Sequence, residues 1–250
     1  MWIVAARDKV MDASQFRGTT CSAPAARSRW MRDLVLKHLP PRRPLRILDL
    51  GCGTGSLVIE LASALDGVAI TGIDVSGANI AAARARRAAT PSTSRVEFEE
   101  ADYLAYDAPP FDVIVTDGVL HLVPGSTDTL LTKLARDLGD GGVLVCAMPY
   151  DCAYNRMFGL ARRILRRLRS PATDALILAI ARAMHGRDMD DRSLRERVPY
   201  MYMPPHRLDT AFVSGTGRAV GLNFIARYPV RSVSLSQLRH RVTVLQKETR

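Results

Sequence analysis

The chain has 250 residues, enough for one large domain or a domain with an inserted piece, and its 47% hydrophobic residues can build a sizeable core. The net charge of +10 at pH 7 favours an anionic partner such as nucleic acid, an acidic metabolite or a lipid surface, although arginines spread over exposed helices explain it equally well. The longest apolar run, Ala175–Met184, falls short of the ~20 residues that a membrane span requires.

The cysteines and the first residues favour a cytoplasmic protein. No two cysteines have CxxC spacing and none has a histidine partner at zinc spacing, so reduced and mostly buried thiols are expected. Residues 1–12 lack an apolar core followed by a small-residue cleavage site, so no secretory signal is expected. The four cysteines are Cys21, Cys52, Cys146 and Cys152.

Residues 1–44 are expected to form an N-terminal helical cap ahead of the main domain. They contain a loop-like segment, "FRGTTCSAPAAR", and end in a stiff proline-rich connector at His38–Pro44. The main domain is expected to occupy residues 45–250.

From Leu45 to about Met148, apolar runs alternate with stretches of helical periodicity, a pattern typical of a parallel sheet covered by helices. The expected strands are Leu45–Leu50, Val68–Asp74, Val96–Glu99, Phe111–Thr116 and Val143–Met148. The expected helices are Ser56–Leu65, Ser76–Ala89 and Ser126–Leu138. Ser76 is the expected N-cap of its helix, and Gly67 and Gly139 stand where helices are expected to end.

The pattern changes after Pro149, and residues 150–207 are expected to form a helical insertion that acts as a lid over the substrate site. Its basic amphipathic helix, 156–169, has one apolar face, which is expected to cover the pocket, with arginines opposite. That face consists of Met157, Ala161, Ile164, Leu165 and Leu168. Contact of those arginines with anionic lipid or nucleic acid is the weaker hypothesis. The final segments, "GLNFIARYPVRSVSL" and "HRVTVLQKE", are expected to pair as an antiparallel hairpin. The sequence therefore predicts an α/β fold with a doubly wound, mostly parallel seven-stranded sheet.

A glycine-rich loop follows the first expected strand in the segment "LRILDLGCGTGSL". Gly51, Gly53 and Gly55 give GxGxG, whereas the dinucleotide fingerprint GxGxxG requires a glycine at the position of Ser56. The carboxylate of Asp49, two residues ahead of the loop, would repel a pyrophosphate and attract a cation. A plain strand-to-helix turn is the alternative.

Further acidic residues follow the next strands. Asp74 ends the second strand, near the interval at which a ribose-binding acid occurs, and Asp102 and Tyr103 follow the third with a polar group and a ring that can hold adenine. Because ligands bind outside the carboxyl ends of parallel strands, Asp49, Asp74 and Asp102 are expected to converge there. A positively charged nucleoside without phosphate suits that setting. Helix capping by Asp74 and packing of Tyr103 are the alternatives.

The segments "ILDLGCGTG", "ITGIDVSGANIAAAR", "EADYLAYD", "FDVIVTDGVLHLVP" and "DGGVLVCAMP" come in the order seen in class I S-adenosylmethionine-dependent methyltransferases. The chain resembles this family over roughly Leu45–Pro149, and the terminal hairpin fits as well. The resemblance implies the Rossmann-like methyltransferase fold, with S-adenosyl-L-methionine as cofactor.

The resemblance also implies roles for individual residues. Asp49 and the glycine loop would hold the methionine part, Asp74 the ribose hydroxyls, and Asp102 with Tyr103 the adenine, while Asp117 would line the methionyl and substrate side. The expected cofactor-binding residues are Asp49, Gly51, Cys52, Gly53, Gly55, Asp74, Val75, Asp102, Tyr103 and Asp117.

His121 lies just past the fourth strand, beside the expected methyl position. As a general base it would accept a proton from an oxygen or nitrogen acceptor and contribute ~10²–10⁴-fold in rate; local packing of the ring is the alternative. Arg17 or Arg29 would pair with the methionine carboxylate, unless both are plain surface arginines. No metal site is expected, because Asp117 and His121 lack a third ligand. The expected substrate-lining residues are Tyr150, Tyr200, Tyr202, His206 and Arg207.

The sequence thus predicts methyl transfer to an oxygen or nitrogen of a small-molecule acceptor, with an anionic acceptor and any oligomeric state left open. RNA methylation and S-adenosylmethionine binding without turnover are alternatives. The family's exocyclic-amine enzymes carry an (Asp/Asn/Ser)-Pro-Pro-aromatic motif where this chain has Thr116-Asp117-Gly118-Val119, and the Pro-Cys pair of DNA cytosine methylation is missing, so both versions of nucleic-acid methylation are disfavoured. Asp49 and the missing third glycine disfavour an NAD-dependent oxidoreductase.

Overall fold

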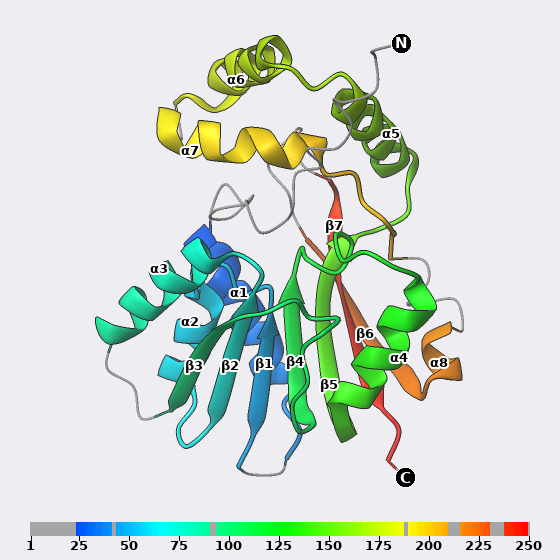
Figure 1. Ribbon diagram of the computed structural model, residues 1–250. Coiled ribbons are helices and arrows are strands. Elements are labelled where there is room, and N and C mark those ends of the chain that lie inside the picture. Colours follow the sequence, from blue (N-terminus) through cyan, green and yellow to red (C-terminus); the bar gives the residue numbers. More distant parts are fainter. Residues whose placement is uncertain are drawn as a thin grey trace, which may run out of the picture.

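The computed structural model describes residues 24–41, 44–90, 94–187, 190–209, 216–230 and 238–249. Its centre is a seven-stranded sheet in the order β3-β2-β1-β4-β5-β7-β6 (Figure 1). The strands are β1 (Arg46–Leu50), β2 (Ala69–Asp74), β3 (Arg95–Glu100), β4 (Phe111–Asp117), β5 (Leu138–Pro149), β6 (Leu222–Pro229) and β7 (His240–Lys247). The first five run parallel and β7 pairs antiparallel with both β5 and β6, which confirms the predicted doubly wound sheet and its terminal hairpin.

Helices cover both faces of the sheet (Figure 1). One face is packed by α1 (Pro24–Lys37), α2 (Ser56–Ala64) and α3 (Gly77–Ala88), and the other by α4 (Thr127–Asp137), which contacts α8 (Thr216–Ala219). Serine caps begin two of these helices, because the Ser76 Oγ accepts from the Asn79 N–H at 3.4 Å and the Ser126 Oγ from the Thr129 N–H at 3.0 Å. The predicted cap at Ser76 is confirmed.

One predicted boundary is wrong. β5 begins at Leu138, five residues before the expected Val143, and Leu138 pairs with Phe111 of β4. Gly139 therefore lies inside this strand rather than at a helix end, because α4 passes into β5 without a loop.

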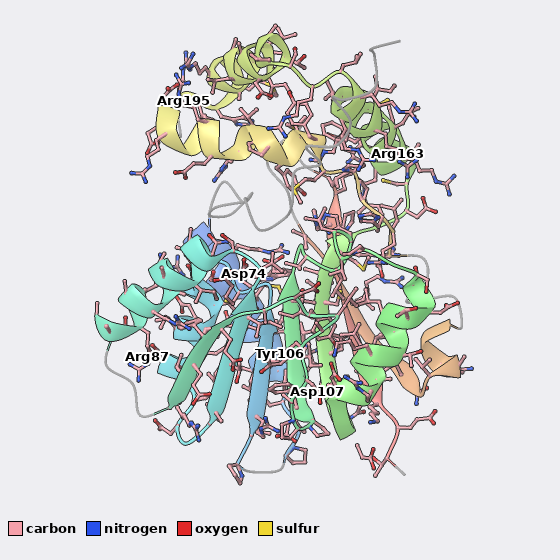
Figure 2. The ribbon with its side chains drawn as sticks, in the orientation of Figure 1. Asp74, Arg87, Tyr106, Asp107, Arg163 and Arg195 are labelled. Carbon is pink, nitrogen blue, oxygen red and sulfur yellow. The ribbon has the colours of Figure 1, made fainter. Side chains whose placement is uncertain are left out.

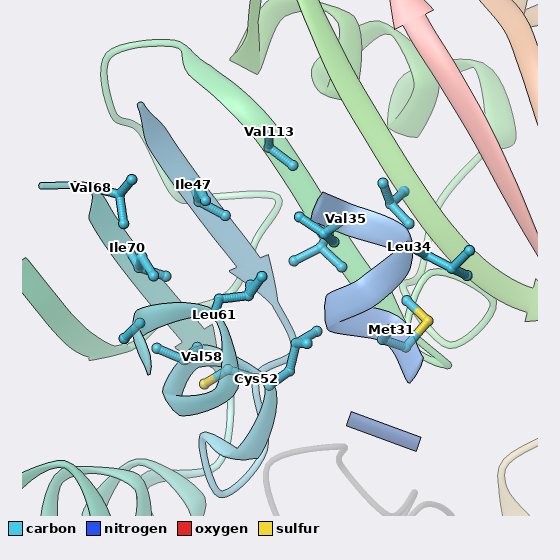
Figure 3. Packing of buried hydrophobic residues seen from close by; sticks show 14 of the residues in the cluster. Met31, Leu34, Val35, Ile47, Cys52, Val58, Leu61, Val68, Ile70 and Val113 are labelled. Atoms are coloured by element: carbon cyan, nitrogen blue, oxygen red, sulfur yellow. The ribbon is translucent and has the colours of Figure 1, made fainter. Parts of the chain in front are cut away.

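The core beneath α1 and α2 fixes the position of the N-terminal helix. Met31, Leu34 and Val35 of α1 are buried against apolar side chains of the sheet, which include Ile47 and Val113 (Figure 3). Burial of such side chains contributes roughly 1.5–3 kcal/mol each relative to exposure. This packing anchors α1 across the sheet and determines which of its polar residues reach the carboxyl ends of the strands.

The chain between β5 and β6 forms the predicted helical insertion. Its helices are α5 (Ala153–Arg167), α6 (Pro171–His185), α7 (Asp191–Arg197) and the 3₁₀ helix η2 (Val198–Tyr202). They lie above the edge of the sheet at which the parallel strands end (Figure 1). A small core of Leu178, Leu194, Val198 and Tyr202 joins them. Within the described segments, no helix has the length and apolar character needed to cross a membrane.

Most of the α5 face expected to cover the pocket is exposed; among its residues only Leu165 is half-buried, against the small core of the insertion. Met157 and Leu168, from the face expected to cover the pocket, are each 62% exposed, whereas Asn155, Gly159 and Arg162 are buried. The inner side of α5 meets backbone groups that need polar partners. The Asn155 amide donates to the Tyr150 and Arg239 carbonyls at 2.7 and 2.8 Å and accepts from the Arg239 N–H at 2.8 Å, and an apolar side chain there would remove all three hydrogen bonds.

Candidate functional site

The glycine loop closes tightly across the end of β2. The Gly51 and Cys52 N–H groups donate to the Ile73 carbonyl at 2.8 and 2.9 Å. Gly51 has a φ of +75°, and a Cβ there would lie 2.2 Å from the Val119 Cγ2. A side chain at position 51 is therefore excluded by both the backbone and the neighbouring loop.

The Asp74 carboxylate joins this loop to the start of α3. It accepts from the Gly53 N–H at 3.0 Å, from the Ser76 N–H at 2.8 Å and from the Asn79 amide at 3.3 Å. Burial raises the pKa of Asp74, and the hydrogen bonds from Ser76, Gly53 and Asn79 oppose that rise. Ser76, rather than Asp74, caps the helix, so Asp74 stands beside the glycine loop as part of the site.

Three carboxylates meet at this edge. Asp49 is buried, and its pKa is raised to about 8 by that burial and by the negative charges of Asp117 and Asp74. The Asp49 carboxyl is therefore mostly protonated at neutral pH. Figure 2 shows Asp74 at the end of the sheet that faces the insertion.

The arginine that reaches this edge of the sheet is Arg27 of α1, rather than the Arg17 or Arg29 expected from the sequence. The Arg27 Nε and Nη2 donate to the two oxygens of Asp117 at 2.8 and 2.7 Å, with the side chains 13% and 31% exposed. Arg29 is exposed, and Arg17 lies outside the described residues. Helix periodicity could have shown that 27 and 29 face different sides of α1, but only its packing selects the side.

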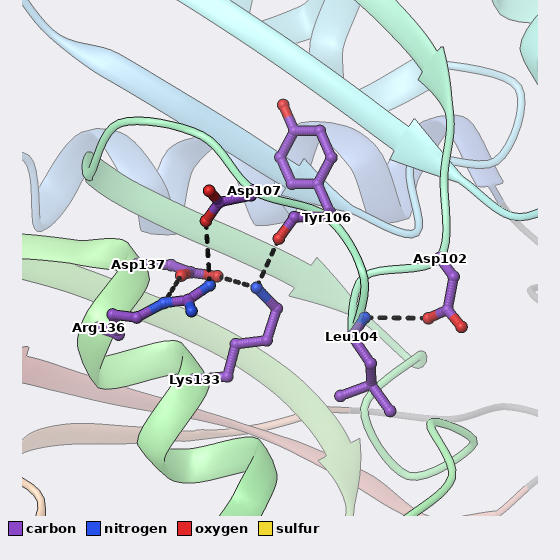
Figure 4. Close-up of polar contacts among 7 residues, drawn as sticks. All are labelled: Asp102, Leu104, Tyr106, Asp107, Lys133, Arg136 and Asp137. Carbon is purple, nitrogen blue, oxygen red and sulfur yellow. Dashed lines mark hydrogen bonds and ion pairs between the residues drawn. The ribbon is translucent and has the colours of Figure 1, made fainter.

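The loop after β3 is anchored by α4 (Figure 4). The Lys133 ammonium donates to the Tyr106 carbonyl at 2.7 Å and pairs with Asp137 at 2.8 Å. Asp102 is exposed at the start of this loop, and one of its oxygens accepts from the Leu104 N–H at 2.9 Å. The loop therefore presents Asp102 in a defined orientation.

Two of the expected cofactor residues have their side chains in the core. Tyr103 is 3% exposed among apolar residues of β4 and α4, and the Lys133 Nζ lies 4.7 Å from its ring centre. The expected stacking of Tyr103 on adenine is therefore corrected to packing, because no face of the ring is accessible. The Cys52 thiol packs beneath α2 and its burial raises its pKa, so only the Cys52 backbone can face a ligand. Val75 is half-buried next to Asp74.

His121 is buried beside a second histidine. Neither nitrogen of the His121 ring has a hydrogen-bond partner among the described residues, and the His240 ring lies 5.6 Å away, centre to centre. Burial and the charges of His240, Arg162, Arg207 and His206 lower the pKa of His121 well below its usual value. In the segments that the structure describes, no three His, Cys, Asp or Glu side chains are grouped as a metal site.

His240 is a site residue that the sequence expectations omit. Its Nδ1 lies 2.7 Å from the Leu238 carbonyl, which makes that nitrogen the donor and leaves Nε2 as an acceptor, 3.8 Å from where a Cβ on Gly118 would stand. Burial lowers the pKa of His240 to about 4, against the opposing charge of Asp117. The predicted topology could have pointed to His240. Because β7 runs antiparallel to β5, its first residue pairs with Pro149 at the carboxyl end of β5.

Residues 203–207 hold the loop after β4. Arg207 donates from Nη1 to the Leu120 and Val123 carbonyls at 2.5 and 2.7 Å, and from Nη2 to the Gly125 carbonyl at 2.7 Å. The His206 N–H donates to the His121 carbonyl at 2.8 Å, while its side chain is exposed. The expected substrate contact of Arg207 is therefore corrected to a clamp, because both its Nη1 and its Nη2 are occupied by these carbonyls, although its Nε is buried without a partner among the described residues.

The three tyrosines of the insertion have different surroundings. The Tyr202 hydroxyl donates to Asp174 at 2.5 Å within the core of the insertion, which corrects its expected place in the substrate site. Tyr150 is half-buried, with the Arg241 guanidinium 5.4 Å from its ring centre. Tyr200 is buried and packs on Arg162, whose guanidinium carbon lies 4.2 Å from the ring centre.

Residues 48–144 match a family model described as a methyltransferase domain. A trans-aconitate 2-methyltransferase of Methylobacterium nodulans is 34% identical over 162 residues, which are 64% of this chain and 58% of that protein. A second trans-aconitate 2-methyltransferase, from Streptomyces avermitilis, is 37% identical over 52% of this chain and 50% of its own length. The chain thus spans a little over half the length of the curated relatives it matches.

Solved structures agree on the architecture. Magnesium protoporphyrin IX methyltransferase from Synechocystis PCC 6803, determined with bound SAH, has a TM-score of 0.59 over 90% of this chain and 84% of that chain. The two sequences are 15% identical, so this likeness establishes the fold alone.

Proposed function

We propose that this chain carries a class I S-adenosylmethionine-dependent methyltransferase domain and transfers the methyl group of the cofactor to an oxygen atom of a small-molecule acceptor. The observation that carries the proposal is the meeting of Asp49, Asp74 and Asp117 beside the glycine loop. An adenosyl sulfonium without phosphate is complementary to this edge, whereas a pyrophosphate would be repelled.

Arg27 and Asp117 are complementary to the amino-acid end of the cofactor. Without a ligand their charges neutralise each other through two hydrogen bonds of 2.7 and 2.8 Å. We assign Arg27 to the methionine carboxylate and Asp117 to the methionine ammonium group, so that one internal ion pair is exchanged for two. Asp49 adds negative charge on the same edge when it ionises.

Asp74 and Asp102 suit the adenosine end. The Asp74 Oδ1 already accepts from both Ser76 and Asn79, but Oδ2 accepts only from Gly53, and its second lone pair can accept from a ribose hydroxyl. We assign Asp102 and the backbone at Val75 to the adenine side. The glycine loop, including the Cys52 backbone, lies between these two ends of the site.

S-adenosylmethionine supplies a methyl carbon bonded to a positively charged sulfur. The protein holds the acceptor oxygen in line with that bond and keeps water away, and α5, α6 and α7 are placed to do so above the carboxyl edge (Figure 1). The lowered pKa of His121 makes its neutral ring a weak base, so we assign it to hydrogen bonding with the acceptor rather than to proton removal.

The relatives favour oxygen as the accepting atom, since every heteroatom of trans-aconitate is oxygen. The test compares binding of S-adenosylmethionine and NAD by calorimetry, followed by incubation with methyl-labelled cofactor and either trans-aconitate, a metabolite extract or RNA. Binding of S-adenosylmethionine alone and a labelled small molecule are expected. Labelled RNA, or cofactor binding without any product, would replace the proposal with one of its alternatives.

Replacement of Asp74 by alanine is expected to weaken S-adenosylmethionine binding about ten-fold or more, because the ribose contact and the link to the Gly53 N–H are lost together. Calorimetry checks this. Asp107→Ala is the matched control, because Asp107 is an exposed carboxylate paired with Arg136 away from the site. Equal affinities for the Asp74 variant and the wild type would remove Asp74 from the cofactor site.

Cofactor binding is expected to release a proton at neutral pH. The pKa of Asp49 is raised to about 8, so the group is protonated in the ligand-free protein and ionises beside a bound cation; affinity should rise between about pH 6 and pH 8. Calorimetry in buffers of different ionisation enthalpy measures the release. Asp49→Asn retains the shape of the side chain but has no carboxyl proton to release. If the wild type and this variant released the same number of protons, Asp49 would not be the source.

A further inference from the structure

The insertion buries a charge where an apolar side chain was available. Arg162 of α5 is 0% exposed, whereas Leu160 and Ile164 of the same helix are 55% and 48% exposed. Burying a guanidinium without a counter-ion is costly, and a fold optimised for stability alone would turn an apolar side chain inward. The buried arginine therefore points to an anionic ligand.

The Arg162 guanidinium contacts two aromatic rings and one backbone carbonyl. Its carbon lies 4.2 Å from the Tyr200 ring centre and 5.4 Å from that of Phe158, and Nη1 donates to the Met203 carbonyl at 3.5 Å. Nε and Nη2 are buried and have no partner among the described residues. These two nitrogens form the edge of a guanidinium that binds a carboxylate through two parallel hydrogen bonds.

Another arginine of this protein binds a carboxylate through the same two nitrogens. Arg27 uses its own Nε and Nη2 to bind both oxygens of Asp117 at 2.8 and 2.7 Å. Arg162 offers the corresponding pair of donors with no internal carboxylate to occupy them among the described residues.

The Arg162 edge lies on the acceptor side of the site. Its Nη1 donates to the Met203 carbonyl, and three residues further on the His206 N–H donates to the His121 carbonyl in the loop after β4. The charge of Arg162 also lowers the pKa of His121 and of His240, the first residue of β7, which pairs with Pro149 at the carboxyl end of β5. The His121 ring nitrogens are likewise buried and without partners in the described part of the chain. Residues 203–206 thus contact both Arg162 and the loop that carries His121, and each of these two side chains has buried donors without a partner in the described part of the chain.

We propose that Arg162, assisted by His121, anchors a carboxylate of the acceptor, so that the substrates are small acids with at least two carboxylates. The inference rests on the proposed methyltransferase function. The anchored carboxylate is not the nucleophile, because two charge-assisted hydrogen bonds hold its lone pairs. An oxygen of the second carboxylate group of the acceptor donates a lone pair to the methyl carbon of the cofactor. The bond between that carbon and sulfur breaks, its electron pair goes to sulfur, and the sulfonium becomes a neutral thioether.

No proton has to leave in this reaction, since a carboxylate is already ionised at neutral pH. Two histidines held neutral by burial are compatible with that requirement, whereas an alcohol acceptor would need a stronger base than either of them.

The experiment measures acid binding and cofactor binding separately. Trans-aconitate, citrate and their methyl esters are titrated by calorimetry into the protein saturated with S-adenosylhomocysteine, and methyl transfer from labelled cofactor is followed in parallel. Wild type is expected to bind at least one acid and to reject its fully esterified form. Arg162→Met, which retains a long side chain between Tyr200 and Phe158, should weaken acid binding ~100-fold with cofactor affinity unchanged.

Arg162→Lys and Arg163→Met complete the design. Lysine retains the charge without the two-point edge and should be intermediate, whereas Arg163 is the exposed neighbour on α5 and its variant should match wild type (Figure 2). Equal acid affinity in Arg162→Met and wild type would overturn the inference. If Arg162→Met does not fold, wild-type binding of esters as tightly as acids overturns it. Failure of wild type to bind S-adenosylmethionine would instead defeat the proposed function.

Discussion

Gly51→Ala is expected to abolish measurable S-adenosylmethionine binding and to lower the melting temperature more than any other single substitution in the glycine loop. An alanine at a φ of +75° costs ~1–2 kcal/mol in backbone strain. Its Cβ would also stand 2.2 Å from the Val119 Cγ2, so the loops after β1 and β4 must separate, at ~1–3 kcal/mol. Displacement of the Gly51 and Cys52 N–H groups from Ile73 would then distort the cofactor site.

Gly67→Ala is the control that separates the cost of backbone strain from the cost of a steric clash with a neighbouring side chain. Gly67 has a φ of +64°, yet nothing lies within 4 Å of a Cβ placed there. That variant should lose ~1–2 kcal/mol, equivalent to a few degrees in melting temperature, and retain full cofactor affinity. Val119→Ala in the Gly51→Ala background should recover part of the stability, because it removes the two methyl groups that lie nearest. Equal effects of Gly51→Ala and Gly67→Ala on cofactor affinity would contradict the assigned role of the loop.

Arg27→Met is expected to weaken S-adenosylmethionine binding by ~30–100-fold, because the methionine carboxylate loses a bidentate, charge-assisted partner. Asp117 simultaneously loses the two hydrogen bonds that it accepts without ligand. Since Asp117 is 31% exposed, water replaces part of that loss and the protein should still fold. Calorimetry measures the affinity and thermal denaturation the stability.

Arg29→Met supplies the control for this prediction, because Arg29 is exposed on the same helix. It should leave affinity and melting temperature near those of wild type. A purely structural Arg27–Asp117 pair would change stability and leave cofactor affinity intact. Methionine offers a sharper check: if it binds the wild type, Arg27→Met should reduce that binding as well, whereas adenosine binding should be unaffected.

The local sequence determined the parts of the protein that depend on short-range patterns. The alternation of apolar runs with helical stretches is sufficient to predict five parallel strands, and the glycines at 51, 53 and 55 predict the sharp turn after the first. The residues at strand ends follow from the same pattern. Because parallel strands all end at one edge, the pattern predicts the meeting of Asp49 and Asp74, whereas the third carboxylate acting on Asp49 is Asp117 and not the expected Asp102, which is exposed.

Only the tertiary structure decided which side chains of each helix or loop are buried and which face the site. α1 presents Arg27 rather than Arg29, the Tyr103 ring lies beneath Lys133, and α5 buries Arg162 while exposing Met157. Periodicity identifies the faces of a helix but not which face is buried when both carry large side chains.

Which face of α5 is buried depends on the segments it packs against, whose backbone carbonyls and aromatic rings need polar or cationic partners. These neighbours are distant along the chain: Arg162 packs on Tyr200, and His240 meets His121 through an antiparallel strand that the chain reaches more than a hundred residues later. Local patterns therefore determined which segments are strands and which carboxylates lie at their ends, whereas the groups we assign to the acceptor depend on long-range packing that no local window of residues contains.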